Sequence, residues 1–102
     1  MDAVVANYRM LTGNSPMMPL YLFGYIQSKE RYVSSDDLIN TLKEYRQRQI
    51  PIDMIVQDWN YWPEGQWGNM SMNPKFYPDK RKLADEIHSL HAKLMISIWP
   101  NA

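Results

Sequence analysis

Asp58 and Trp59 place a carboxylate next to an indole ring, directly after the segment Ile52 to Gln57, whose centre is nearly continuously apolar. Removing an ionised carboxylate from water and placing it between apolar surfaces costs several kcal/mol of free energy, unless hydrogen bonds compensate for the lost water. Sugar hydroxyls would supply such bonds, and aromatic rings cover the apolar face of a pyranose. An aspartate that only caps a loop would also follow a strand directly. These two residues alone therefore leave open whether Asp58 binds a sugar or caps the loop.

The other reactive side chains suggest no second site. His88 and His91 lie at positions i and i+3 of a predicted helix, but no third metal ligand is evident and surface histidines are commoner. The sequence has no cysteine, which excludes disulfide scaffolds and thiolate zinc sites. It also has no glycine-rich phosphate loop and no nucleophile elbow. We therefore expect neither a metal nor a cofactor.

Charge and hydropathy narrow the range of partners. The formal net charge is zero, so no electrostatic field favours nucleic acid or an anionic membrane. No apolar stretch approaches the ~18 residues that a membrane span needs. The first five residues do not resemble a signal peptide. We expect no nucleic-acid partner and no membrane partner, and the compartment stays undetermined.

The chain reads as helices alternating with strands. Apolar residues recur at helical spacing in three segments, and Ser34 with Asp37 resembles a capping box at the start of the second. Short apolar runs bounded by proline, glycine or polar residues predict strands between the helices. The expected order is helix 2–12, strand 20–24, helix 35–48, strand 53–57, helix 79–91 and strand 93–99.

This order predicts parallel strands joined through helices. The strands start roughly 33 and 40 residues apart, near the average of about 31 residues per unit in a (β/α)8 barrel. The expected fold class is α/β, a partial (β/α)8 TIM barrel with about the first three parallel strands. A flavodoxin-like sheet fits the spacing too. Ligands of both folds lie in the loops after the strands, here 24–31, 58–67 and 97–101.

Four motifs in this order resemble glycoside hydrolase family 31. The first is FGYIQSKERY at residues 23–32, and the second is IPIDMIVQDWNYW at 50–62. FYPD at 76–79 and KLMISIWP at 93–100 follow, and YRMLTG at 8–13 resembles the lead-in helix of the family. The resemblance covers essentially the whole chain in register.

The resemblance implies a retaining α-glycosidase that acts on α-xylosides or α-glucosides, with segments 27–32 and 57–62 closer to the xyloside-cleaving members. Asp58 matches an aspartate that hydrogen-bonds the sugar in the −1 subsite, and Trp59 matches its neighbour there. Ser97 matches a lining position on the third strand that a bulkier residue often fills. Trp99 and Tyr25 are expected near the mouth of the barrel.

The resemblance also implies that the catalytic residues lie elsewhere. Family members carry the nucleophile on the fourth strand and the acid/base aspartate on the sixth, whereas this sequence reads as three strands. Retaining hydrolysis needs two carboxyls about 5–5.5 Å apart. Asp53 starts a strand and Asp79 opens an outer helix, so neither is expected to substitute. We expect part of a glycosidase that is inactive alone, with a carbohydrate as the partner of the full-length protein.

A second hypothesis is a small self-contained carbohydrate- or protein-binding domain whose loop aromatics contact a partner. The chain stops two residues after Pro100, with no helix to cover the last strand, which favours the first hypothesis. Three parallel strands leave two open edges and apolar faces. We therefore expect the isolated chain to self-associate.

Overall fold

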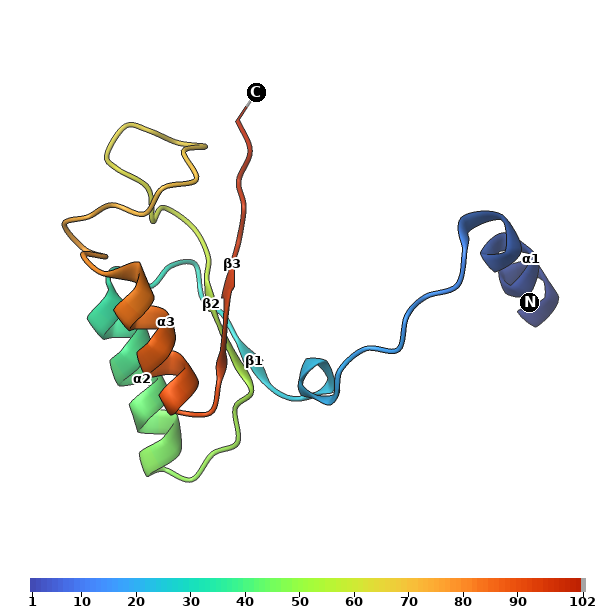
Figure 1. Ribbon diagram of the computed structural model, residues 1–102, viewed down its shortest axis with the longest axis horizontal. Helices are drawn as coiled ribbons and strands as arrows, with labels where there is room; N and C mark the ends of the chain where they lie inside the picture. The colour runs from blue at the N-terminus through green and yellow to red at the C-terminus, as the bar shows by residue number, and fades with distance from the viewer. Residues whose placement is uncertain (102) are drawn as a thin grey trace.

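The computed structural model describes residues 1–101, in which three strands form one open sheet with two helices on one side (Figure 1). The strands are parallel and lie in the order β1-β2-β3. Helices α2 and α3 pack against each other and against the same face of the sheet, and the opposite face carries no helix within residues 1–101. The elements are α1 (Asp2–Thr12), a 3-10 helix η1 (Leu20–Phe23), β1 (Ile26–Gln27), α2 (Ser35–Gln47), β2 (Met54–Gln57), α3 (Lys80–Ser89) and β3 (Lys93–Ile96).

Side-chain caps start both packed helices. The Ser34 hydroxyl accepts a hydrogen bond from the Asp37 N–H at 3.2 Å, and the Asp37 carboxylate accepts one from the Val33 N–H at 3.1 Å. This reciprocal arrangement is close to the capping box expected from the sequence. At α3, the Asp79 carboxylate accepts from the Lys82 N–H at 2.9 Å. Asp79 is therefore a helix cap, as its position predicted.

The core lies between β2 and the two helices. All four β2 residues are buried. Ile55 belongs to the apolar cluster shared with α2 and α3, whereas Met54 and Val56 do not. Successive strand residues point to opposite faces of a sheet. Ile55 and Gln57 therefore face the helices, while Met54 and Val56 face the open side.

The strand expected at 20–24 is wrong: this run is the 3-10 helix η1, and the first strand is Ile26–Gln27. The reason lies in the partner strand. Ile26 pairs with Met54, so the same register continued backwards would place Phe23 opposite Pro51. Proline has no N–H to donate to a strand ladder. The apolar run therefore has no partner, and pairing begins only at Tyr25, whose carbonyl accepts the Asp53 N–H at 3.0 Å.

The third strand is also shorter than the expected 93–99. It ends at Ile96, and the last bond of the ladder runs from the Ser97 N–H to the Gln57 carbonyl at 3.0 Å. Because β2 ends at Gln57, residues 98 and 99 have no neighbouring strand to pair with. The chain continues in an extended form past Trp99 (Figure 1).

Gly24 and Asp53 join η1 to the start of β2. The Asp53 carboxylate accepts a hydrogen bond from the Tyr25 N–H at 3.3 Å. It lies so close to Gly24 that a Cβ at this position would overlap it. Asp53 is thus a structural residue at the amino end of the sheet.

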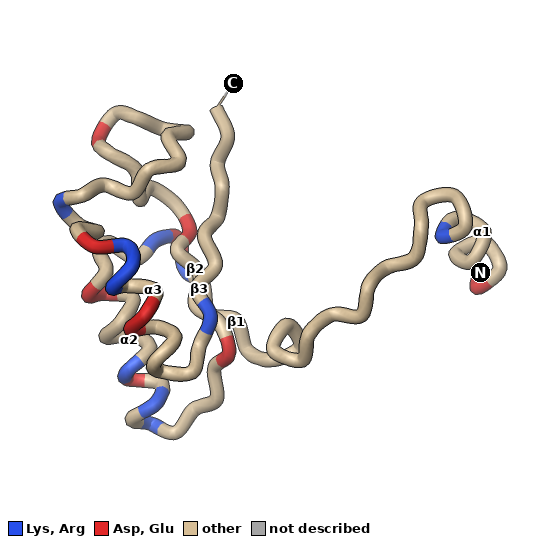
Figure 2. Tube along the Cα trace, in the orientation of Figure 1, with Lys and Arg blue, Asp and Glu red and all other residues tan. Residues whose placement is uncertain are grey.

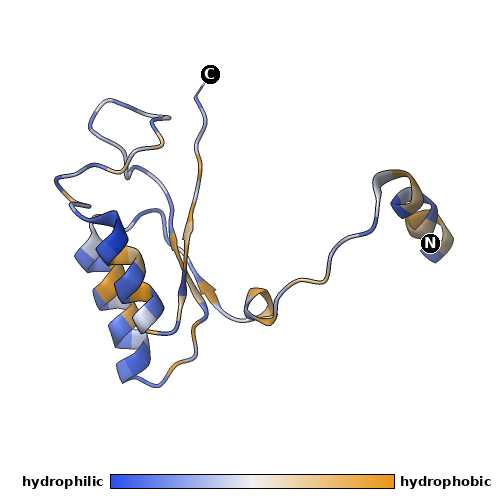
Figure 3. Cartoon of the chain, viewed as in Figure 1, coloured by the Kyte–Doolittle hydropathy of each residue, from blue (hydrophilic) through white to orange (hydrophobic). Residues whose placement is uncertain are grey.

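Helix α1 stands apart from the sheet, at the end of an extended segment (Figure 1). None of its residues is buried, and Val4 and Leu11 are 71% and 89% exposed. Figure 3 shows hydrophobic residues on this helix and on η1 without any element packed over them. The described chain measures 52 × 41 × 22 Å.

Charged residues concentrate on the outer surfaces of α2 and α3, where both signs are interspersed (Figure 2). Exposed pairs such as Arg81 with Asp85, 3.5 Å apart, contribute little to stability. None of the helices described in residues 1–101 has the length and apolar character needed to cross a membrane.

Candidate functional site

A hollow of about 470 Å³ lies at the carboxyl ends of the strands. Asp58 follows β2 directly, and strand alternation places it on the open face of the sheet, opposite to Gln57. Two acidic residues and three tryptophans line the hollow: Glu30, Asp58, Trp59, Trp67 and Trp99. The fold therefore brings together three of the residues expected at the site, namely Asp58, Trp59 and Trp99.

Asp58 and Trp99 contact each other directly across the hollow. The indole Nε1–H of Trp99 donates a hydrogen bond to Oδ1 of Asp58 at 3.3 Å. An ionised carboxylate has about four acceptor positions, so one indole leaves most of them free for a ligand. The bond joins the end of β2 to the segment after β3, and it holds the carboxylate beside an aromatic surface.

Trp59 is held by its backbone and by its ring. Its N–H donates to the Glu30 carbonyl at 3.2 Å. Its ring meets Trp62 edge to face, with centroids 6.2 Å apart and an interplanar angle of 90°. Trp62 is buried and packs on Tyr61, with centroids 5.4 Å apart. Such aromatic pairs are stabilising beyond the area that they bury, so the ring contact and the backbone bond together hold Trp59 as a wall of the hollow.

Ser97 is not among the residues that line the hollow, although strand alternation turns its side chain to the same open face as Asp58. Its N–H closes the ladder to Gln57, and its carbonyl accepts a hydrogen bond from the Tyr61 hydroxyl at 3.0 Å. Burial raises the pKa of Tyr61, which keeps this hydroxyl protonated as a donor. Through its main chain, Ser97 connects β3 to the loop after β2.

The expected place of Tyr25 near the mouth is wrong. Tyr25 precedes β1 and lies at the amino end of the sheet, where its carbonyl pairs with Asp53. Its ring packs on Tyr45 of α2, with centroids 5.8 Å apart, in a separate hollow that includes Ile50 and Pro51. The error follows from the first strand: when the strand moves from 20–24 to Ile26–Gln27, Tyr25 changes from its end to its beginning.

Two lining residues, Glu30 and Trp67, lie in loops expected to carry ligands but were not singled out from the sequence. Glu30 belongs to a polar loop that reads as an ordinary solvated segment, although it comes soon after the true end of β1. Trp67 precedes Gly68, which has a φ of 87°, a conformation that favours glycine. A Cβ on Gly68 would overlap Asn101, so this turn brings the loop of Trp67 against the segment after β3.

The histidines lie at the other end of the sheet from the hollow. His88 and His91 border a small depression with Tyr21, Asp53 and Lys93. Within residues 1–101, no group of three or more histidine, cysteine, aspartate or glutamate side chains is arranged to hold a metal ion.

Comparison with known proteins places this geometry in a family. Residues 15–102 match the Glycosyl hydrolases family 31 TIM-barrel domain. An alpha-xylosidase of Saccharolobus solfataricus is 46% identical over 99 residues, which cover 97% of this chain and 14% of that protein. Alpha-xylosidase A of Aspergillus niger is 31% identical over 102 residues, covering 98% of this chain and 14% of that protein.

Solved structures agree with this result. A GH31 alpha-xylosidase from Xanthomonas citri superposes with a TM-score of 0.87 at 48% identity, covering 94% of this chain and 10% of the other. A GH31 alpha-xylosidase from a soil metagenome, complexed with xylose, gives 0.82 at 37% identity, covering 89% and 13%. The expected partial TIM barrel is confirmed, and the chain spans a small part of each relative. The chain belongs to glycoside hydrolase family 31.

Proposed function

We propose that the hollow at Asp58 is part of the −1 sugar subsite of an α-glycoside hydrolase that acts on α-xylosides or α-glucosides. The observation that carries this proposal is the Asp58 carboxylate, held by Trp99 within a tryptophan-lined hollow at the carboxyl ends of parallel strands. Ligands of such folds bind at this end. Several relatives carry the name alpha-xylosidase, and one of the solved structures is a complex with xylose.

Each lining residue has a distinct part in the proposed subsite. Asp58 accepts hydrogen bonds from sugar hydroxyls, and a hydrogen bond to a charged group contributes about 1.5–3 kcal/mol. The rings of Trp59 and Trp99 cover the apolar C–H surface of the pyranose. Glu30 adds a second acceptor at the rim. Ser97, on the same face of the sheet as Asp58, lines the sugar from the third strand, and its backbone bonds help to place Trp99.

These residues bind the sugar and do not cleave it. Retaining hydrolysis needs a nucleophile and an acid/base about 5–5.5 Å apart across the glycosidic bond. The family resemblance implies that these residues lie on the fourth and sixth barrel strands, and the sheet of residues 1–101 has three strands. The chain therefore supplies part of a subsite and is inactive by itself.

A titration with methyl α-D-xyloside tests this function. We expect the indole N–H signals of Trp59 and Trp99 to shift in NMR spectra, while the glycoside stays intact. Replacing Asp58 with asparagine keeps the size of the side chain but removes the charge. This change should weaken binding at least about tenfold, which corresponds to about 1.4 kcal/mol.

Asp85→Asn is the matched control, because Asp85 is an exposed carboxylate on α3 whose ion-pair partner is Arg81. It should leave the affinity unchanged. Equal affinities of the Asp58→Asn variant and the parent chain would contradict the proposal. So would the release of free xylose by the parent chain.

We also propose that the isolated chain self-associates. Apolar side chains of α1 have no packing partner within the described chain, and Met95 and Ile96 of the edge strand β3 are 40% and 44% exposed. Open strand edges and exposed apolar residues favour pairing between copies. Sedimentation velocity should show a mass that rises with concentration. A variant without residues 1–19 separates exchange of α1 from edge pairing, and a clean monomer at every concentration would contradict both.

A further inference from the structure

Gln57, the residue before Asp58, has a polar side chain and yet no contact with solvent. Gln57 is 0% exposed, and strand alternation turns its amide away from the hollow, towards the helices. Buried amides are costly unless hydrogen bonds satisfy them. The partners of Gln57 therefore show which parts of the fold this position connects.

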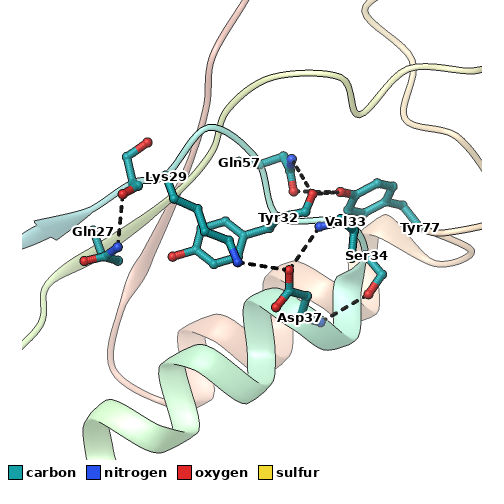
Figure 4. A network of polar contacts seen from close by, with 9 residues as sticks. Gln27, Lys29, Tyr32, Val33, Ser34, Asp37, Gln57 and Tyr77 are labelled. Carbon is teal, nitrogen blue, oxygen red and sulfur yellow. Dashed lines mark hydrogen bonds and ion pairs between the residues drawn. The ribbon is translucent and has the colours of Figure 1, made fainter.

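Two side chains converge on one carbonyl group, as Figure 4 shows. Nε2 of Gln57 donates to the Tyr32 carbonyl at 3.2 Å, and the Tyr77 hydroxyl lies 2.7 Å from the same oxygen. The Tyr77 hydroxyl is also 2.9 Å from Oε1 of Gln57. We call these three groups the carbonyl clamp: the Tyr32 carbonyl, the Gln57 amide and the Tyr77 hydroxyl.

The Tyr77 hydroxyl is a permanent donor in this arrangement. It has one hydrogen for two acceptors, so it serves the Tyr32 carbonyl and the Gln57 Oε1 in turn or shares the hydrogen between them. Burial raises the pKa of Tyr77 to about 12, so the hydroxyl stays protonated near neutral pH. Removing it would leave Oε1 of Gln57 without its donor.

The clamp joins three of the segments that carry the walls of the hollow; the fourth, after β3, carries Trp99. Tyr32 is two residues after Glu30, Gln57 directly precedes Asp58, and Tyr77 ends the loop that holds Trp67. A second bond, from the Trp59 N–H to the Glu30 carbonyl, lies next to the clamp. The loop after β1 is therefore attached to the end of β2 at two neighbouring points, one on each side of Asp58.

We propose that Gln57 and Tyr77 are positioning residues of the hollow. They fix the loop of Glu30 against the end of β2, and so set the distance between Glu30, Asp58 and the ring of Trp59. Neither residue touches the sugar. The role in sugar binding rests on the proposed function, whereas the positioning itself concerns the free chain and is measured there.

Hydrogen exchange in the free chain tests the positioning. Tyr77→Phe removes one hydroxyl and keeps the ring, and Gln57→Met removes the amide at similar volume. In either variant we expect the Trp59 amide to exchange at least about tenfold faster relative to the Ile55 amide, because its bond to Glu30 opens locally. Ile55 lies at the centre of the sheet and reports global stability.

Ile87→Val is the control, because Ile87 is fully buried on α3 and does not border the hollow. The packing lost in this variant should lower global stability, so the amides of Trp59 and Ile55 should exchange faster by the same factor. The same uniform increase in Tyr77→Phe and Gln57→Met would overturn the proposal, because it would show that the clamp only stabilises the core.

Titration with methyl α-D-xyloside gives the second readout. The two clamp variants should bind it about fivefold more weakly than Ile87→Val does at equal global stability. Normal affinity in both variants, together with a weakened Asp58→Asn variant, would overturn the clamp proposal alone. If the parent chain does not bind the glycoside, the sugar-binding proposal fails, and the Trp59 exchange still decides whether the clamp positions the loop.

Discussion

Ile55→Ala is expected to remove about 3–5 kcal/mol of the free energy of unfolding, which leaves little folded protein at 25 °C. Ile55 is 0% exposed at the centre of β2, paired with β1 on one side and β3 on the other. Its side chain faces the apolar cluster shared with α2 and α3. Truncation leaves a cavity that these elements cannot fill, because the strands are fixed by their ladders.

Urea denaturation followed by circular dichroism measures this loss. Ile98→Ala is the matched control: Ile98 is the same residue type after β3, but it is 61% exposed and has no strand neighbour. It should change the unfolding free energy by less than about 0.5 kcal/mol. A loss below about 1 kcal/mol in Ile55→Ala would show that the sheet and helices do not share one cooperative core.

Arg46→Met is the second large effect, with an expected loss of about 2–3 kcal/mol. The Arg46 guanidinium on α2 donates to the Leu90 carbonyl and the Ile52 carbonyl, both at 2.8 Å, and to the His91 carbonyl at 3.0 Å. It therefore caps the carboxyl end of α3 and ties it to the segment before β2. Methionine keeps the apolar stem but leaves these carbonyls without their donor.

The size of the Arg46 effect is judged against Arg48→Met. Arg48 is on the same helix but pairs with Glu44 in solvent, so its loss should cost less than about 1 kcal/mol. Arg46→Lys should recover only part of the stability, because an ammonium group lacks the planar fork that reaches several carbonyls. Equal denaturation midpoints of Arg46→Met and Arg48→Met would contradict the capping role.

Local sequence patterns predicted many of the helices and strands. The Ser34–Asp37 cap joins residues three positions apart, so it is visible in the sequence. The strand β2 follows a nearly continuous apolar stretch whose residues are all buried, and such a run needs no alternation to be recognised. The position of Asp58 after this strand is a local property as well, and it placed the residue at the mouth.

Features that depend on distant partners could not be predicted in this way. The apolar run at 20–24 does not pair, because its register neighbour would be Pro51, and that register is set by contacts far along the chain. The misplaced strand then misplaced Tyr25. Glu30 reads as one charge in a polar loop expected near the site, and bonds to distant residues, among them the one from the Trp59 N–H to its carbonyl, bring it to the hollow.

The order of the strands in the sheet has a consequence for how the chain is made. Each strand pairs with the one before it in sequence, so no strand waits for a partner that lies several units ahead. A nascent chain that leaves the ribosome can therefore add one unit at a time to an edge that already exists. During synthesis the most recently formed strand edge and the face without helices stay uncovered. A chaperone would bind these surfaces while the next part of the chain is made.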